Sequence, residues 1–529
     1  MRLGIDFGTT RTVVSLCDRG NYPVLSFDTA QGDAVDGIPT IVAARDGELR
    51  YGLDALAVRD EPTWTTLRSF KRALAADGAL EQSLDVGGAR VPLFDLLVGF
   101  LSHVRDAILT RSNLPEAQRA EPEMRVVVAT PANAMGTARF MTLEAFRRAG
   151  FHVIATLNEP SAAGFEYTHA HQRTISKRRD HVIVYDLGGG TFDASLVRVT
   201  DLRHDALVTG GVARLGGDDF DAALLDLVLA RRAAPVDSAS HARWLEACRE
   251  AKERVGPNTR KLVVEVGDEQ ITIPVAEYYE ACAPLVERTI DAMLPVMRGA
   301  DANDGGATTP ADGADAGDAG VTTLADSADA GALDEIAGIY VVGGASTLPV
   351  VSRMLKERFG RRVFRSPYPS AATAVGLAIA ADDTSGFTLS DRFSRALGVF
   401  REAGGGRDVT FDVIFDRETA LPAPGSPPVR VERRYRVAHD LGHFRVVEAT
   451  DVADGGAPTG DLSLFADVRF GFVPELQRDG VDLAGADVHR LGGLGTSVVE
   501  AYELDAHGLV RMSITDEQTG FARSFALTR

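Results

Sequence analysis

Two segments of the chain have residue types and spacing that suit them to holding a polyphosphate. Each is an apolar run that ends in an aspartate and continues into a turn of glycine and threonine, at Leu3–Thr10 and Ile183–Thr191. Successive backbone N–H groups in such a turn can cradle phosphate oxygens, because glycine lets the chain approach a ligand closely. The carboxylates of Asp6 and Asp186 can hold Mg²⁺ through water. One such hairpin is commonly an ordinary turn, but a pair predicts a clamp on one phosphate chain.

Two further glycine pairs extend this pattern. Gly216-Gly217 precedes a helical stretch that begins at Asp218, and Gly343-Gly344 precedes one that begins at Leu348. The free N–H groups and the dipole at the start of a helix favour an anion. We therefore expect both pairs to contact a nucleotide. As structure alone, they would be the turns that lead into helices.

Alternating strands and helices must position these turns. Near-continuous apolar runs at residues 125–130 and 181–186 predict strands that are buried on both faces. Helical spacing is found at residues 136–149, 161–170, 218–232, 242–255, 275–297, 348–359 and 371–381. This order predicts an α/β domain over residues 1–384. Within it, residues 299–333 are almost entirely Ala, Asp, Gly and Thr, which predicts a disordered insertion.

The character of the chain changes after about Ser385. Helical spacing fades, and short strands separated by turn residues take over. These strands are expected at residues 409–415, 429–437, 444–449, 462–470, 498–504, 509–513 and 523–527. They predict an all-β sandwich domain over residues 385–529.

Composition restricts the class of protein. The chain has 529 residues, which is too long for one core, and its 56 basic and 75 acidic residues give a formal net charge of −19. This charge opposes broad nucleic-acid binding. We find no signal-peptide pattern and no apolar run long enough to cross a bilayer. Three scattered cysteines favour a reducing compartment. We expect a soluble cytoplasmic protein with no membrane contact.

The first two-thirds of the chain resembles the DnaK-type, seventy-kilodalton heat-shock chaperones, which belong to the actin-like ATPase superfamily. The resembling motifs follow the order of the family and lie at residues 6–10, 69–72, 130–132, 158–163, 186–193, 216–221 and 342–344. The resemblance implies a two-lobed α/β actin-like ATPase domain with duplicated phosphate-binding hairpins. It also implies a following β-sandwich that binds unfolded peptides. ATP or ADP with Mg²⁺ would be the cofactors, and ATP hydrolysis would be slow.

The resemblance implies roles position by position. Lys71 matches the catalytic lysine that orients the attacking water, and Glu159 matches a carboxylate near the metal. Asp6 and Asp186 would organise Mg²⁺, and Asp193 would support its shell. Pro131 and Arg139 match a pair that senses the nucleotide. The nucleotide itself would be contacted by Gly8, Thr9, Thr10, Arg11, Gly188, Gly189, Gly190, Thr191, Gly216, Gly217, Lys252, Gly256, Gly343 and Gly344.

The adenosine side departs from the family pattern. Arg249 and Gly256 flank Lys252 where many family members have an acid and a serine. Ala345 and Thr347 replace a usual serine and arginine. We therefore expect altered recognition of the base, with ATP still the expected nucleotide.

Other departures concern partners and coupling. Arg11 replaces a residue near a monovalent-cation position, and Ala155 replaces a basic residue that contacts the J-domain co-chaperone in the family. Residues 382–394 lack the usual leucine-rich linker, and no helical lid follows the sandwich. These features predict a lidless member that releases peptide quickly.

Three functions stay open at this point. The first is a chaperone that hydrolyses ATP slowly to control peptide binding by its sandwich. The second is a nucleotide-dependent module that does not hydrolyse ATP and holds one dedicated protein partner. The third is a small-molecule kinase of the same superfamily, for which the chain has no motif with a catalytic aspartate.

Overall fold

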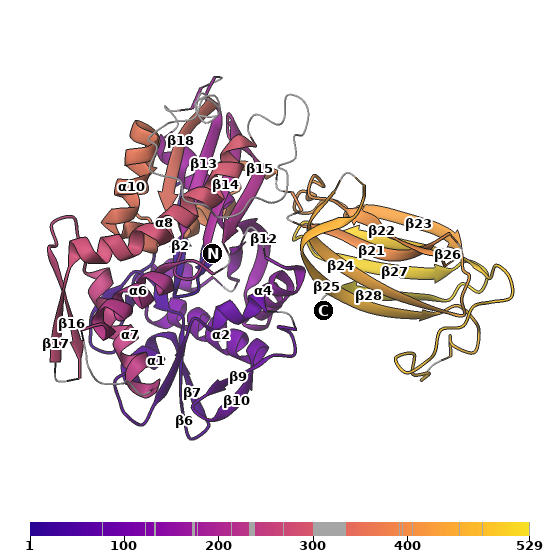
Figure 1. Cartoon of the computed structure of the whole chain (residues 1–529), viewed down its shortest axis with the longest axis horizontal. Coiled ribbons are helices and arrows are strands. Elements are labelled where there is room, and N and C mark those ends of the chain that lie inside the picture. Colours follow the sequence, from indigo (N-terminus) through magenta and orange to yellow (C-terminus); the bar gives the residue numbers. More distant parts are fainter. Residues whose placement is uncertain are drawn as a thin grey trace.

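The chain forms a larger α/β body and a smaller all-β body beside it (Figure 1). The computed structural model describes residues 1–527 except 77, 122, 132–133, 172–174, 177, 213, 232–237, 268, 300–334, 391, 394, 405, 454 and 479. The insertion expected at residues 299–333 lies outside the described residues, apart from Gly299. Among the described residues, no helix is both long and apolar enough to span a membrane.

The first sheet of the α/β body has the strand order β12-β11-β1-β2-β5. Its strands are β1 (Arg2–Phe7), β2 (Arg11–Leu16), β5 (Ile38–Pro39), β11 (Arg125–Thr130) and β12 (His152–Asn158). Strand β1 is antiparallel to β2 and parallel to β11. The apolar run predicted at residues 125–130 is confirmed as a strand with these limits, and it is buried on both faces.

The second sheet repeats this arrangement and has the order β19-β18-β13-β14-β15-β20. Its strands are β13 (His181–Leu187), β14 (Phe192–Thr200), β15 (Arg203–Val212), β18 (Ile336–Val342), β19 (Val363–Arg365) and β20 (Thr388–Ser390). Strand β13 is antiparallel to β14 and parallel to β18, as β1 is to β2 and β11. Two duplicated halves are therefore confirmed.

Helices pack around both sheets. They are α1 (Gly52–Val58), α2 (Leu93–Thr110), α3 (Glu116–Arg119), α4 (Gly136–Arg148), α5 (Glu159–His171), α6 (Gly217–Leu229), α7 (Ser238–Glu253), α8 (Val275–Arg298), α10 (Pro349–Phe359) and α11 (Ala372–Ala381). All the helices predicted from spacing are confirmed, with shifted ends. Helices α5 and α11 cross in close contact, because a Cβ added at Gly376 would lie 1.7 Å from the Ala162 carbonyl oxygen.

Smaller strands extend the two lobes beyond the main sheets. They are β3 (Phe27–Asp28), β4 (Ala34–Val35), β6 (Ile41–Arg45), β7 (Glu48–Tyr51), β8 (Thr65–Arg68), β9 (Ser83–Val86), β10 (Ala89–Pro92), β16 (Lys261–Val266) and β17 (Glu269–Pro274). Strands β7-β6-β8 form a three-stranded sheet, and β16 and β17 form a hairpin. These additions flank the space between the halves.

The all-β body is a sandwich of two four-stranded sheets, β22-β21-β24-β25 and β23-β26-β27-β28. The strands are β21 (Ala396–Ala403), β22 (Asp408–Phe415), β23 (Val429–Arg436), β24 (Leu441–Val452), β25 (Pro458–Gly471), β26 (Ser497–Leu504), β27 (Val510–Asp516) and β28 (Ala522–Leu527). The predicted sandwich is confirmed. The sequence prediction missed β21, because its residues 396–399 are all buried and do not alternate.

Candidate active site

The two predicted hairpins have the same turn. After β1, the Gly8 N–H donates to the Arg11 carbonyl oxygen at 3.1 Å. After β13, the Gly188 N–H donates to the Thr191 carbonyl oxygen at 3.0 Å. Each turn is closed by residues three positions apart, so this geometry follows from the local sequence.

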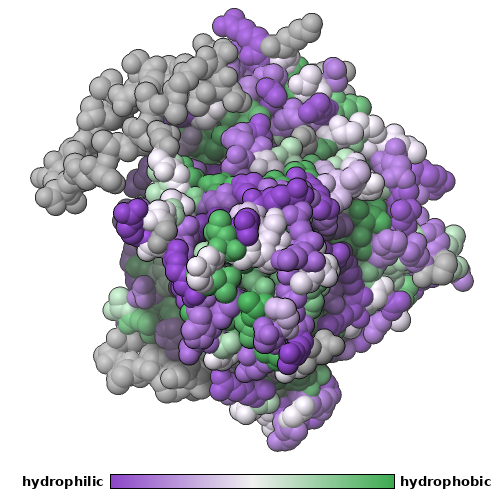
Figure 2. Space-filling model, turned by 90° about the vertical axis from the view of Figure 1, so that its right-hand side faces the viewer, coloured by the Kyte–Doolittle hydropathy of each residue, from purple (hydrophilic) through white to green (hydrophobic). Residues whose placement is uncertain are grey.

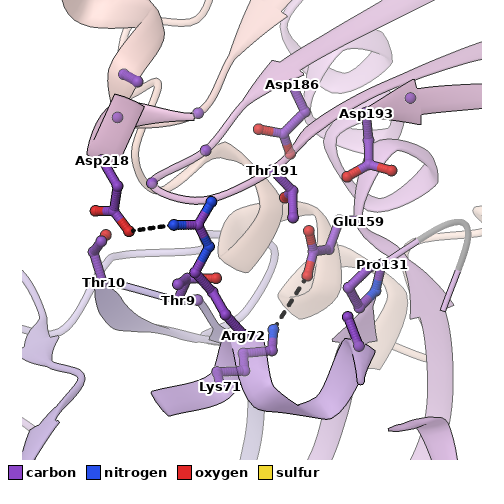
Figure 3. Close-up of a pocket in the computed structure, with 18 of the residues that line it drawn as sticks. Thr9, Thr10, Lys71, Arg72, Pro131, Glu159, Asp186, Thr191, Asp193 and Asp218 are labelled. Atoms are coloured by element: carbon purple, nitrogen blue, oxygen red, sulfur yellow. Dashed lines mark hydrogen bonds and ion pairs between the residues drawn. The ribbon is translucent and has the colours of Figure 1, made fainter. Parts of the chain in front are cut away.

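The two turns face one another across a cavity of about 1340 Å³. A Cβ added at Gly189 would lie 2.4 Å from Thr10 Cγ2, and one added at Gly190 would lie 3.1 Å from Thr9 Cγ2. The tips therefore touch, and Figure 3 shows threonines from both turns at the same cavity. Such opposed turns can hold a polyphosphate from two sides.

Four of the carboxylates that line this cavity act on one another electrostatically, those of Asp6, Glu159, Asp186 and Asp193. Burial, followed by the charge of Glu159, raises the pKa of Asp6 to about 7 and the pKa of Asp193 to about 7. Burial also raises the pKa of Asp186 well above its ordinary value, and the charges of Glu159 and Asp6 add to the effect. A divalent cation fits here, because it would offset the repulsion among these groups.

The protein by itself supplies few ligands for a cation at this cavity. In the described part of the chain, no group of three or more histidine, cysteine or acidic side chains is placed to hold a metal ion by itself. Mg²⁺ commonly keeps several waters and uses only one or two carboxylates together with substrate phosphates. The residues therefore suit Mg²⁺ that arrives with a nucleotide.

Lys71 comes from the 3₁₀ helix η1 (Phe70–Ala75) and is only 7% exposed. Its Nζ donates to the Phe7 carbonyl oxygen and lies 3.4 Å from Glu159 Oε1. Figure 3 shows the side chain directed toward Glu159 in the cavity. The Lys71 ammonium is therefore enclosed beside the carboxylates rather than solvated.

Gly343 follows β18 and approaches the second hairpin closely. Its φ is +87°, and an added Cβ would lie 2.4 Å from Asp186 Oδ1. Only glycine suits this position. The helix predicted from Leu348 is confirmed as α10, which begins at Pro349, and a short 3₁₀ turn over Ala345–Thr347 lies between it and Gly344.

Helix α6 supports the second hairpin from behind. The Gly217 N–H donates to the Gly188 carbonyl oxygen at 2.9 Å, and the Asp218 N–H donates to the Gly189 carbonyl oxygen at 2.8 Å. These two N–H groups therefore already have protein acceptors. The start of α6 thereby positions the turn of the second hairpin, and contact of Gly216 and Gly217 with a nucleotide stays a prediction.

At the adenosine side, the basic residues Arg249 and Lys252 form ion pairs with acidic side chains of α6. Lys252 Nζ donates to the Gly217 carbonyl oxygen at 2.8 Å and lies 2.6 Å from Asp221 Oδ1. Arg249 donates to Asp221 Oδ2 at 3.1 Å and to Asp218 Oδ1 at 2.9 Å. These ion pairs shape the end of α7 around α6.

Arg72 was missed as a site residue. It follows Lys71, and its guanidinium donates to Asp218 Oδ2 at 3.2 Å and to the Gly190 carbonyl oxygen at 3.1 Å. Figure 3 shows this pair reaching across the cavity from one half to the other. The sequence held no signal for this pair, because the two residues lie 146 positions apart in separate motifs.

Most of the predicted site residues meet at one place. Those that line the cavity are Asp6, Gly8, Thr9, Thr10, Arg11, Lys71, Pro131, Arg139, Glu159, Asp186, Gly188, Gly189, Thr191, Asp193, Gly217, Lys252, Gly343 and Gly344. Gly190, Gly216 and Gly256 are not among the lining residues. Gly256 instead lies past the end of α7, where its N–H donates to Thr259 Oγ1 at 2.9 Å.

Comparison with known proteins places this cavity in a family. Residues 107–305 match the family model described as Hsp70 protein. The chain is 30% identical to Chaperone protein HscA of Escherichia coli (strain UMN026), over 98% of this chain and 77% of that protein. It is 28% identical to Chaperone protein HscA of Serratia proteamaculans over the same shares. It is 31% identical to the Chaperone protein HscA homolog of Variovorax paradoxus, over 73% of this chain and 58% of that protein.

The similarity to the HscA proteins covers the sandwich as well as the α/β body, since it extends over nearly the whole chain. The duplicated sheets and the opposed turns agree with it. The chain therefore belongs to the Hsp70 family, whose members are ATP-dependent chaperones.

Proposed function

We propose that the chain is an ATP-dependent chaperone that binds ATP with Mg²⁺ in the cleft, hydrolyses it slowly, and thereby controls peptide binding by its sandwich. The observation that carries the proposal is the pair of matched turns on opposite sides of one cavity, with Lys71 buried beside them. The relatives named above are chaperones, which favours this function over a non-hydrolysing module. A cytoplasmic location stays a prediction from the sequence.

Each polar group of the cleft has a role in this proposal. Mg²⁺ would neutralise charge on the phosphates while Asp6 and Asp186 hold its waters, and Asp193 supports that shell. Lys71 orients the attacking water and offsets charge that develops on the terminal phosphate. Glu159 holds the Lys71 ammonium in place, since the two groups lie 3.4 Å apart. Thr191 and the glycines of the two turns cradle the phosphates.

The proposed peptide site is the outer face of the β22-β21-β24-β25 sheet. Phe400, Val409, Leu462 and Leu464 are large apolar side chains that are 41% to 70% exposed. Phe400 also contacts Phe411, with 5.1 Å between ring centroids. Figure 2 views the molecule from the sandwich side and shows patches of hydrophobic surface among hydrophilic surface there. Exposed apolar groups that gather on one sheet suit an extended apolar peptide.

The strand register indicates that these exposed apolar side chains lie on one face of the sheet. Leu464 pairs with Val447, and Val447 pairs with Gly398, which lies two residues before Phe400. Because alternate residues of a strand point to the same side, Phe400, Leu462 and Leu464 share the outer face. A bound peptide would place its own alternate side chains there.

Single-turnover hydrolysis of ATP with Mg²⁺ tests the catalytic part of the proposal. We expect the natural chain to release phosphate and Lys71→Ala to lose at least about 100-fold in rate, as when a group that stabilises the transition state is removed. Lys356→Ala, which changes an exposed lysine of α10, is the matched control and should hydrolyse ATP normally. Nucleotide binding without hydrolysis by the natural chain would instead favour the non-hydrolysing module.

A further inference from the structure

The sandwich contacts the α/β body at the start of α4 (Figure 1). Both carboxylate oxygens of Glu448, on β24, accept a hydrogen bond from the Gly136 N–H, at 3.2 and 3.1 Å. Gly136 is the first residue of α4, so its N–H is one that the helix itself leaves unsatisfied. The helix dipole also favours a negative charge at this end. A carboxylate of one body therefore caps a helix of the other.

This contact is enclosed by protein. Glu448 is only 3% exposed, and the guanidinium groups of Arg139 and Arg395 in its surroundings are also buried. Burial raises the pKa of Glu448, while the Gly136 N–H and the charges of Arg395 and Arg139 act in the opposite direction. Taking one member out of such a buried set is costly, because the others are left without compensation.

The two bodies also approach at the level of the backbone. A Cβ added at Gly136 would lie 2.1 Å from Phe465 Cε2 and 3.0 Å from Glu448 Oε1. Phe465 is a core residue of the sandwich, so it cannot move away without disturbing that core. A second contact joins α4 to the sandwich, since an added Cβ at Gly508, in the turn between β26 and β27, would lie 1.9 Å from Arg139 Nη1. The start of α4 therefore fits the sandwich only with glycine at position 136.

Helix α4 is also part of the cleft wall. Pro131 follows the end of β11 and lines the cavity, as do Met135 and Arg139 at the beginning of α4. Arg395 and Thr450 of the sandwich side line the same cavity. A change in the cleft that displaces α4 therefore also moves the Gly136 N–H relative to Glu448. A displacement of about 1 Å takes this group out of hydrogen-bond range.

We propose that Glu448 is a positioning residue that couples the nucleotide cleft to the sandwich through the start of α4. The inference rests on the proposed function, because it needs nucleotide binding in the cleft and peptide binding by the sandwich. When α4 holds the position seen here, Glu448 caps it and the two bodies stay together. When the cleft displaces α4, the cap is lost and the sandwich is released.

The test measures peptide dissociation from the full chain with and without ATP, together with basal ATP turnover. Gly136→Ala blocks the contact from the helix side, and Glu448→Ala removes it from the sandwich side. We expect both variants to keep basal ATP turnover. In each, the factor by which ATP changes the rate of peptide dissociation should be at least about fivefold smaller than in the natural chain. Glu448→Gln keeps an acceptor oxygen without the charge, so it should recover part of the effect.

Matched controls separate the proposal from general damage. Gly492→Ala adds a methyl group where nothing lies within 4 Å, and Glu503→Ala removes a more exposed carboxylate of β26. Both should behave as the natural chain. If Glu448→Ala does not fold, Gly136→Ala still tests the proposal. Alanine is a better helix former than glycine, so this variant should keep α4 folded. Full coupling in Gly136→Ala would overturn the role of Glu448, whereas absence of turnover in the natural chain would overturn the proposed function.

Discussion

His204 lies fully buried beneath the segment that leads into the sandwich. Its Nε2 lies 2.9 Å from Thr168 Oγ1, and its ring centroid is 4.5 Å from that of Phe165 and 5.8 Å from that of Phe387. Burial lowers the pKa of His204 from 6.5 to about 4. The imidazole is therefore neutral in the folded protein at neutral pH, and Phe387 supplies an apolar contact from the segment between the two bodies.

This histidine makes stability depend on pH. The unfolded chain binds the proton of His204 more tightly than the folded chain does. The contribution of the neutral imidazole to the free energy of unfolding is therefore fully present above about pH 6.5. It is lost as the pH falls toward 4, and the loss is about 3 kcal/mol at most. We expect His204→Gln to flatten the fall in the free energy of unfolding between these values in urea titrations. His489→Gln, at a side chain that is 72% exposed, should leave the slope unchanged. Equal slopes for His204→Gln and the natural chain would contradict the assignment.

Ion pairs join elements of the two halves, η1 to α6 and β8 to α7. Arg72 of η1 pairs with Asp218 of α6, and Arg68 of β8 lies 2.6 Å from Glu246 of α7. All four side chains are partly buried. Since η1 and β8 belong to one half and the two helices to the other, breaking these pairs should let the halves separate more readily and so speed the release of a bound nucleotide.

The element-scale prediction concerns nucleotide release. A partly exposed ion pair contributes about 0.2–1 kcal/mol, so Arg72→Ala should speed ADP dissociation by about twofold to fivefold. Added salt should speed release from the natural chain more than from the variant, because salt screens the pair. Stopped-flow displacement of a fluorescent ADP analogue measures both effects. Arg353→Ala, which removes an ion pair within α10 and a contact with the Tyr279 ring of α8, is the control, and a matching increase there would argue against a role for the closure.

At the scale of the whole molecule, the cleft and the apolar sheet face lie on different bodies that meet at α4. The peptide face belongs to the sheet that also carries Glu448, since β24 contributes to both. A rearrangement at α4 therefore reaches the strands that would hold a peptide. Coupling of about 1–3 kcal/mol between such sites is typical of allosteric proteins.

The peptide face gives the whole-molecule prediction. Leu464→Asp should weaken binding of a fluorescent leucine-rich peptide by about tenfold or more, because a buried leucine contributes about 1.5–3 kcal/mol. The side chain is exposed in the free protein, so folding should be retained. Leu494→Asp changes an equally exposed leucine outside this sheet and should bind as the natural chain does in anisotropy titrations. Undiminished affinity in Leu464→Asp would move the peptide site elsewhere.

Much of the fold and of the cleft follows from short-range sequence. The turns at Gly8 and Gly188 are closed by neighbours three residues away, and the strands before them are apolar throughout. Local patterns of this kind predict the hairpins, the flanking helices and most of the sandwich. They did not predict β21, where burial on both sides removes the alternation that marks a strand.

Taken by itself, the sequence determined the two halves, the opposed phosphate turns and the following sandwich, because each depends on periodicity or on a motif of a few residues. Lys71 was assigned from the resemblance to the family. Only the tertiary structure decided which groups these motifs face. Arg72 meets Asp218 across 146 residues, and Gly136 meets Glu448 across 312. Such partners are chosen by how whole elements pack, and neither charge nor spacing along the chain specifies that packing.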